Sequence, residues 1–100
     1  MPKFKNPGLA AFTRLVSAVR AVNVAAGGGG NVDDAFMDLM QDAADAAENF
    51  RSKEPNIANF QLRTVDSKSY SGGTVQVRGK LKVDFDYWDE SGQQLHYTSV

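Results

Sequence analysis

The chain has 100 residues, of which 42% are hydrophobic, so it is long enough for one domain with a modest core. It contains no cysteine and a single histidine. This composition excludes disulfide bonds and cysteine chemistry, and it argues against a histidine-based metal site. A net charge of −1 gives no overall attraction to nucleic acid or to a membrane surface.

The charges are unevenly distributed along the chain. Residues 1–32 have a charge of +4, because four basic residues stand there without an acid. Residues 33–54 have a charge of −5, because seven acids stand against two basic residues, and the remainder holds five of each sign. We therefore expect the first part of the chain to attract the second.

Residues 1–7 are basic and contain two prolines, which indicates an extended, flexible arm. Residues 8–26 then predict an amphipathic helix. Its apolar stripe consists of Leu9, Phe12, Leu15, Val16, Val19 and Val22. A basic, acid-free helix at this place is also typical of organelle targeting or of a membrane surface, but we favour a retained structural helix. We expect no membrane span, since arginines interrupt the segment and no stretch approaches about 20 apolar residues.

Four glycines, residues 27–30, follow that helix. They cannot sustain a helix, because each costs about 1 kcal/mol relative to alanine in a helix interior, and they indicate a hinge. A phosphate-binding loop is the less favoured interpretation, since no strand precedes the glycines and no Lys-Ser/Thr pair follows them.

A second helix is predicted from a cap at Asn31 or Asp33 to about Arg51 or Lys53. Its apolar face consists of Phe36, Met40, Ala43, Ala47 and Phe50, widened by Leu39 and Ala44. The alanines would allow close approach of another element, either within the domain or in a dimer.

Three strands are predicted after the helices. Residues 60–65 form a short strand, residues 66–73 a polar loop, and residues 74–89 a long strand. In the long strand the apolar parity, Val75 to Tyr87, alternates with a charged parity, so one face packs on a core and the other faces water. Gly79 marks a bend or bulge.

The loop Glu90-Ser91-Gly92 fits a hairpin of three residues ending in a left-handed glycine. This register pairs Asp89 with Gln93 and matches the apolar parities of both strands. It sets Phe85 opposite Tyr97 on the core face. On the outer face it sets His96 opposite Asp86.

The predicted fold class is therefore α+β, a single domain of residues 1–100 in the order ααβββ, with two helices on one face of a three-stranded antiparallel sheet. A helix ahead of a long, bent antiparallel sheet superficially resembles the cystatin and NTF2-like folds. No motif of either family carries over, and no family is assigned.

Few residues offer chemistry. Asp86 and His96 form the one carboxylate–imidazole pair, without a nucleophile beside it. The carboxylates of Asp84, Asp86 and Asp89 lack the spacing of a calcium loop, so we expect no metal site and no cofactor. A basic patch of Arg63, Arg78, Lys80 and Lys82 leaves nucleic-acid binding as a hypothesis that we do not favour.

We expect a non-enzymatic interaction or assembly protein, such as an adaptor, an inhibitor or a component of a viral or mobile-element particle, located in the cytoplasm or the virion. The expected partner-binding residues are Trp88, Tyr70, Asp86, Asp89, Asp38, Asp42 and Asp45. A protein partner and a homodimer, formed through a sheet edge or the alanines, are also expected. The alternative is a pocket protein similar to the NTF2-like or cystatin folds, including an enzyme of that kind, with Asp86 and His96 inside a curved sheet. An open sheet face would favour the first hypothesis, and a deep cavity the second.

Overall fold

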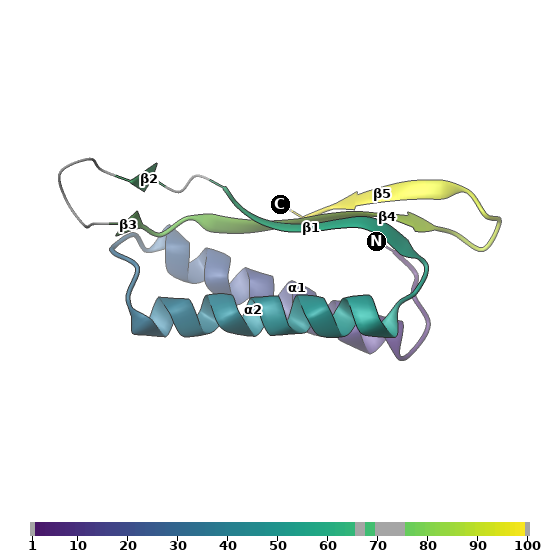
Figure 1. Cartoon of the computed structure of the whole chain (residues 1–100), viewed down its shortest axis with the longest axis horizontal. Coiled ribbons are helices and arrows are strands. Elements are labelled where there is room, and N and C mark those ends of the chain that lie inside the picture. The colour runs from purple at the N-terminus through teal and green to yellow at the C-terminus, as the bar shows by residue number, and fades with distance from the viewer. Residues whose placement is uncertain (1, 66–67, 70–75, 100) are drawn as a thin grey trace.

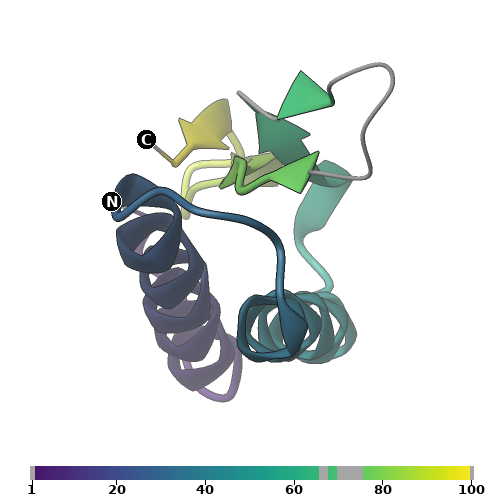
Figure 2. The ribbon, with the colours of Figure 1, turned by 90° about the vertical axis from the view of Figure 1, so that its left-hand side faces the viewer.

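The computed structural model describes residues 2–65, 68–69 and 76–99, and it confirms the α+β fold with element order ααβββ. The main sheet has the antiparallel strand order β1-β4-β5, and β2 and β3 form a small two-stranded sheet. Both helices lie under one face of the main sheet, α1 below β4 and α2 below β1 (Figures 1 and 2). The elements are α1 Gly8–Gly27, α2 Asp34–Lys53, β1 Ile57–Val65, β2 Lys68–Ser69, β3 Gln76–Val77, β4 Lys80–Trp88 and β5 Gln94–Thr98.

Helix α1 packs on the sheet through most of the expected stripe. Its buried residues are Gly8, Ala11, Phe12, Leu15, Ala18, Val19 and Val22. The expectation for Leu9 is wrong, because this side chain is 41% exposed and the buried stripe turns toward Ala11 and Ala18 instead. Among the described residues, α1 is the one helix long and apolar enough to cross a membrane, a test that core helices also pass. Its packing favours the core helix.

Helix α2 begins as the sequence predicts. Asp33 is the N-cap and its side chain accepts a hydrogen bond of 2.8 Å from the backbone N–H of Phe36. That bond, followed by the nearby Arg78 cation, holds the pKa of Asp33 below its ordinary value. Ala46, rather than the expected Ala44, belongs to the buried face, because positions 43, 46, 47 and 50 keep the spacing of one helix side.

The glycine connection is fixed by a side chain from the sheet. Gly29 and Gly30 have positive φ angles of 74° and 100°, a conformation that glycine adopts at no steric cost. Arg78 donates to the carbonyl of Asn31 at 2.8 Å and to Asp33 at 2.9 Å. The expectation that Arg78 belongs to a basic patch on the outer sheet face is therefore wrong. Its side chain turns toward the connection between the helices and is only 19% exposed.

The long strand is interrupted, so the expectation of one continuous strand over residues 74–89 is wrong. Thr74 and Val75 lie outside the described residues, and the chain leaves strand geometry at Arg78 and Gly79 between β3 and β4. The break falls at the predicted bend. Beyond it, the alternation of β4 is confirmed: Leu81, Val83 and Phe85 are buried and the charged residues between them face outward.

Strand β1 begins at Ile57, three residues earlier than the sequence indicates. Its register against β4 shifts between Ala58 and Gln61, and Asn59 has a positive φ of 54°. This bulge interrupts the alternation of side chains. The sequence pattern of residues 57–59 therefore does not read as a strand.

The hairpin register is confirmed. Tyr87 pairs with Leu95, Phe85 with Tyr97 and Asp86 with His96. Gly92 has a φ of 83°, and the backbone N–H of Asp89 donates to the carbonyl of Gln93 at 3.0 Å. The three-residue loop is the one that places both apolar parities on the helix side.

Aromatic rings fill the core between the two layers. Phe85 is fully buried, and its ring lies 5.2 to 6.1 Å from the neighbouring ring centroids. Those neighbours are Phe4, Phe12, Phe50, Phe60, Tyr87 and Tyr97. Phe4 comes from the basic arm and Pro2 is buried as well, so this arm packs against the domain instead of being free.

Replacing Phe85 by alanine is expected to lower the free energy of unfolding by about 3 to 5 kcal/mol, because it opens a cavity between the sheet and the helices. The control is Val24→Ala on the exposed side of α1, which should change stability by less than about 0.5 kcal/mol. Urea denaturation of both variants measures the difference. Equal effects would contradict the assignment of the core.

Candidate functional site

The outer face of the sheet carries a polar network centred on Asp86. Asn59 donates to one carboxylate oxygen at 2.8 Å, and Nδ1 of His96 lies 2.7 Å from the other. The hydrogen bond from Asn59 and then that from His96 lower the pKa of Asp86 below its ordinary value. The network thus joins β1, β4 and β5 across the sheet.

Asp84 extends this network by one step along β4. It pairs with Arg63 at 3.3 Å, and Nε2 of His96 lies 3.9 Å from its other oxygen. The two helices cover the opposite face (Figures 1 and 2), so the imidazole and both carboxylates lie on an open surface. None of these three residues lines either of the two hollows described below.

The chemical capacity of the outer face is small. In the part of the chain that the structure describes, no group of three or more His, Asp or Glu residues could hold a metal ion. Arg63 is engaged by Asp84 and Arg78 is turned away, so the expected basic patch shrinks to Lys80 and Lys82. The face is best described as a network of ion pairs that ties the strands together.

The acidic face of α2 is exposed and partly engaged. Asp38 makes no hydrogen bond or ion pair within the described residues, whereas Asp42 pairs with Arg14 of α1 at 3.0 Å. Asp45 accepts a hydrogen bond of 3.0 Å from Gln41. The basic first helix thus does contact the acidic second one, through a pair whose exposure limits it to about 1 kcal/mol or less.

A wide hollow of about 850 Å³, which we call the end groove, lies where the arm, the end of α2 and the β4–β5 hairpin meet. Its lining combines aromatic rings with both signs of charge. The lining residues are Lys3, Phe4, Lys5, Asn6, Pro7, Lys53, Glu54, Pro55, Asn56, Tyr87, Trp88, Asp89, Glu90, Ser91 and Leu95. Trp88 is 40% exposed there.

Two of the acids in the end groove are bound within the domain. Asp89 accepts from the hydroxyl and backbone N–H of Ser91 and from the backbone N–H of Gln93, at 2.6 to 2.9 Å. The Ser91 hydroxyl and then the Gln93 N–H lower the pKa of Asp89. Glu54 is 8% exposed and accepts from the N–H of Asn56 at 3.4 Å. These carboxylates are committed to the turn and to the end of α2.

The lysines of the end groove are not committed in this way. None of Lys3, Lys5 and Lys53 takes part in an ion pair within residues 2–65, 68–69 and 76–99. All three are exposed at the rim. The lining of the groove therefore combines these cations with the partly exposed ring of Trp88.

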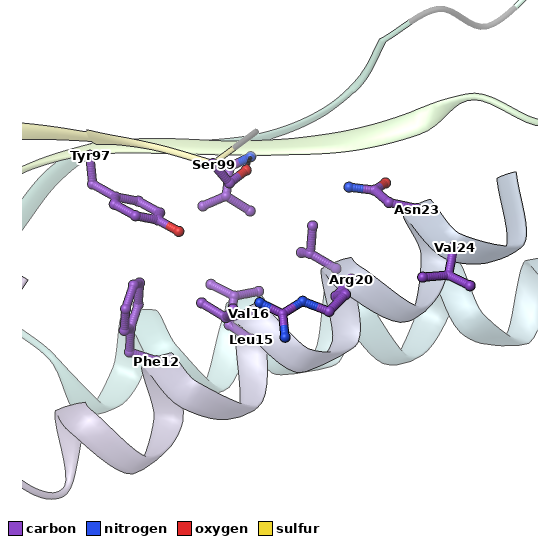
Figure 3. Close-up of a pocket in the computed structure, with 10 residues that line it drawn as sticks. Phe12, Leu15, Val16, Arg20, Asn23, Val24, Tyr97 and Ser99 are labelled. Carbon is purple, nitrogen blue, oxygen red and sulfur yellow. Dashed lines mark hydrogen bonds between the residues drawn. The ribbon is translucent and has the colours of Figure 1, made fainter. Parts of the chain in front are cut away.

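A second hollow, the lateral cavity, lies between α1 and the free end of β5 and has a volume of about 400 Å³ (Figure 3). Tyr97 and Ser99 line it from the sheet and Arg20 from the helix, and its floor is apolar. Asn23 closes one end, where its amide accepts from Leu81 N–H at 2.7 Å and donates to the Leu81 carbonyl at 3.1 Å. The side chain thereby satisfies both backbone groups of Leu81, which no described residue of a strand pairs on that side.

The expected partner-binding residues fall at separate places. The end groove brings Trp88 and Asp89 together, whereas Asp86 lies on the outer sheet face. Asp38, Asp42 and Asp45 lie on α2, and Tyr70 is outside the described residues. The sequence did not indicate the lysines of the end groove, nor that Arg20 and Tyr97 line one cavity. These side chains come from distant parts of the chain, and a local pattern cannot predict that they meet.

Comparison with models of protein families, with curated proteins and with solved structures finds no match.

Asp86→Asn is expected to destabilise the protein at neutral pH and to lose that effect in acid. The pKa of Asp86 lies below its ordinary value of 3.8, so its ionised form stabilises the fold above that pH. This contribution disappears as the pH falls through the lower pKa of the folded state. Denaturation curves measured from neutral pH to well below pH 3.8 follow this loss.

The control for this experiment is Asp38→Asn on the exposed face of α2. Because Asp38 makes no hydrogen bond or ion pair within the described residues, this variant should be as stable as the unmodified protein at neutral pH. If the difference in the free energy of unfolding between the unmodified protein and Asp86→Asn stays constant down to the lowest pH, the ionised form of Asp86 does not stabilise the fold as proposed.

Proposed function

We propose that the protein is a non-enzymatic binding protein and that its end groove docks an acidic segment of another protein. The observation that carries the proposal is the half-exposed Trp88 beside three lysines without ion-pair partners in the described part of the chain. Tryptophan is enriched among the residues that dominate binding energy, and free cations complement carboxylates. Membership of a viral or mobile-element particle, in the cytoplasm or virion, belongs to the same proposal.

A protein segment fits this groove better than a nucleic acid does. Asp89 and Glu90 stand on the same hairpin as Trp88, so the cations of the groove form no continuous row for a phosphate backbone, which carries a charge at every nucleotide. A peptide can place its acids against the lysines and an apolar side chain against the ring. The net charge of −1 also gives no general attraction to nucleic acid.

The enzyme hypothesis has weaker support. Asp86 and His96 lie on the open sheet face, away from the end groove and the lateral cavity. A general base needs a reacting group held within hydrogen-bond reach, and an open face supplies no walls to hold one. From the sequence we expected an open sheet face to favour an interaction protein, and the position of Asp86 and His96 on such a face supports that hypothesis.

The test uses the single tryptophan as its probe. A short peptide of alternating Glu and Leu should change the fluorescence of Trp88 in a saturable way, whereas the Lys and Leu counterpart and a single-stranded oligonucleotide should not. Lys3→Glu combined with Lys53→Glu should weaken the acidic peptide about tenfold or more, since charged contacts at an interface contribute on the kcal/mol scale.

The matched control is Asp38→Lys together with Met37→Ala, both exposed at the other end of α2. This variant should bind the acidic peptide like the unmodified protein. Equal binding of the acidic and basic peptides, or preferential binding of the oligonucleotide, would overturn the proposal.

We also predict a homodimer through the edge of β1. The alanines of α2 are no longer available for this purpose, because Ala43 and Ala47 are buried in the core. In contrast, the edge of β1 has an outward-facing N–H at Thr64. Thr64 lies opposite Leu81, and both backbone groups of Leu81 bond to Asn23 on the far side of β4. The two residues are therefore a pair without mutual hydrogen bonds, and the N–H of Thr64 points away from β4. Among the described residues nothing pairs with this side of β1, whose backbone groups could therefore pair with a second copy.

Light scattering at high micromolar concentration should give a dimer mass for the unmodified protein and a monomer mass for Thr64→Pro. Proline removes the outward N–H without removing a bond to β4. A monomer mass for the unmodified protein would refute the dimer, and a dimeric Thr64→Pro would exclude this edge.

A further inference from the structure

We propose that the lateral cavity is a binding site for a small molecule with an apolar chain and a carboxylate, which Arg20, Tyr97 and Ser99 recognise. This site is separate from the end groove and does not depend on the function proposed for it. The cavity lies between α1 and the end of β5, open on one side to solvent (Figure 3).

The polar groups around the cavity are suited to an anion. The guanidinium of Arg20 can only donate hydrogen bonds, and it forms no ion pair within the described residues. Ser99 already accepts a hydrogen bond of 2.7 Å from the N–H of Val83, which leaves its own O–H to donate. No acid is among the described residues that line the cavity.

Tyr97 adds a third donor. Its ring stands on the sheet side of the cavity and its hydroxyl points toward the space above α1 (Figure 3). Burial raises the pKa of Tyr97, although the Arg20 charge opposes this effect, so the phenol stays protonated at neutral pH. Asn23 supplies no further acceptor, because Leu81 occupies both ends of its amide.

The rest of the lining is apolar. Phe12, Leu15, Val16 and Val19 form the helix side, and Val83 forms the sheet side. Arg20 follows this floor along α1, so a ligand lying along the helix would place its chain on the valines and its charged end at the arginine (Figure 3). A volume of about 400 Å³ is within the range of small-molecule sites, about 300 to 1,000 Å³.

The cavity is a consequence of the way β4 is completed. On the β5 side, the last backbone pairing of β4 among the described residues is at Ser99, whose N–H donates to the Val83 carbonyl at 2.8 Å. The next position, Leu81, is satisfied by the Asn23 side chain. Because a side chain instead of a described strand residue pairs with Leu81, space remains over Val16 and Val19.

Octanoate is the probe that tests this inference. Titration into the labelled protein should shift the backbone amide NMR signals of the cavity residues in a saturable way. Octan-1-ol and octylamine, which share the chain but lack the anion, should bind at least about tenfold more weakly, since hydrogen bonds to charged groups contribute most strongly.

Two variants address recognition. Arg20→Gln should weaken octanoate about tenfold or more and abolish the preference over octan-1-ol, whereas Tyr97→Phe should weaken it about threefold to tenfold. Arg14→Gln is the matched control, because this arginine lies on the same helix but outside the cavity. It should leave the affinity unchanged.

A third variant, Val16→Phe, fills the cavity without changing its charge and should abolish binding while the protein stays folded. The inference is overturned if octanoate shifts no cavity residue, if octan-1-ol binds as tightly as octanoate, or if Arg20→Gln and Arg14→Gln behave alike. Because the acidic-peptide test uses other residues, its failure and the failure of octanoate binding are separate results.

Discussion

The burial of Phe85 at the centre of a cluster of rings is the constraint on which the rest of the structure depends. Its neighbours come from the arm, from both helices and from all three strands of the main sheet. A two-layer domain of this size buries a modest share of its surface, so large rings that each contact several elements contribute disproportionately to its stability. The packing of the arm follows, because Phe4 completes the cluster on one side.

A different interaction organises the opposite end of the elongated domain, which measures 53 by 20 by 19 Å. There Arg78 binds the carbonyl groups of Ala25 and Asn31 and the N-cap Asp33, and its guanidinium lies 5.1 Å from the ring centre of Phe36. One side chain from the sheet thus holds the end of α1, the glycine connection and the start of α2. The glycines permit the sharp path, and the arginine selects one conformation of it.

The features of the fold that depend on neighbouring residues could be predicted from the sequence. The parity of residues 81 to 87 and the three-residue hairpin followed from alternation and from Gly92, and the cap of α2 followed from Asp33. The positions that it missed are those whose partners are distant in the chain. Arg78 has the outward parity of a regular strand, but the break before Gly79 and the partners of the glycine connection turn it inward. Phe4 stands in a basic segment, and only the space beside Phe12 and Phe50 explains its burial.

The residues that line each hollow also come from distant parts of the chain, so neither hollow could be predicted from local patterns in the sequence. The two hollows are nevertheless connected through the aromatic core. The lateral cavity includes Tyr97 in its wall and the end groove includes Tyr87, and both rings pack directly against Phe85. A shared wall transmits binding only if it has two alternative arrangements. Phe85, which contacts both tyrosines but lines neither hollow, is fully buried in a close-packed cluster, and such packing resists rearrangement. The cluster therefore separates the two hollows, and we expect the two proposed ligands, an apolar anion at Arg20 and an acidic segment at Trp88, to bind independently.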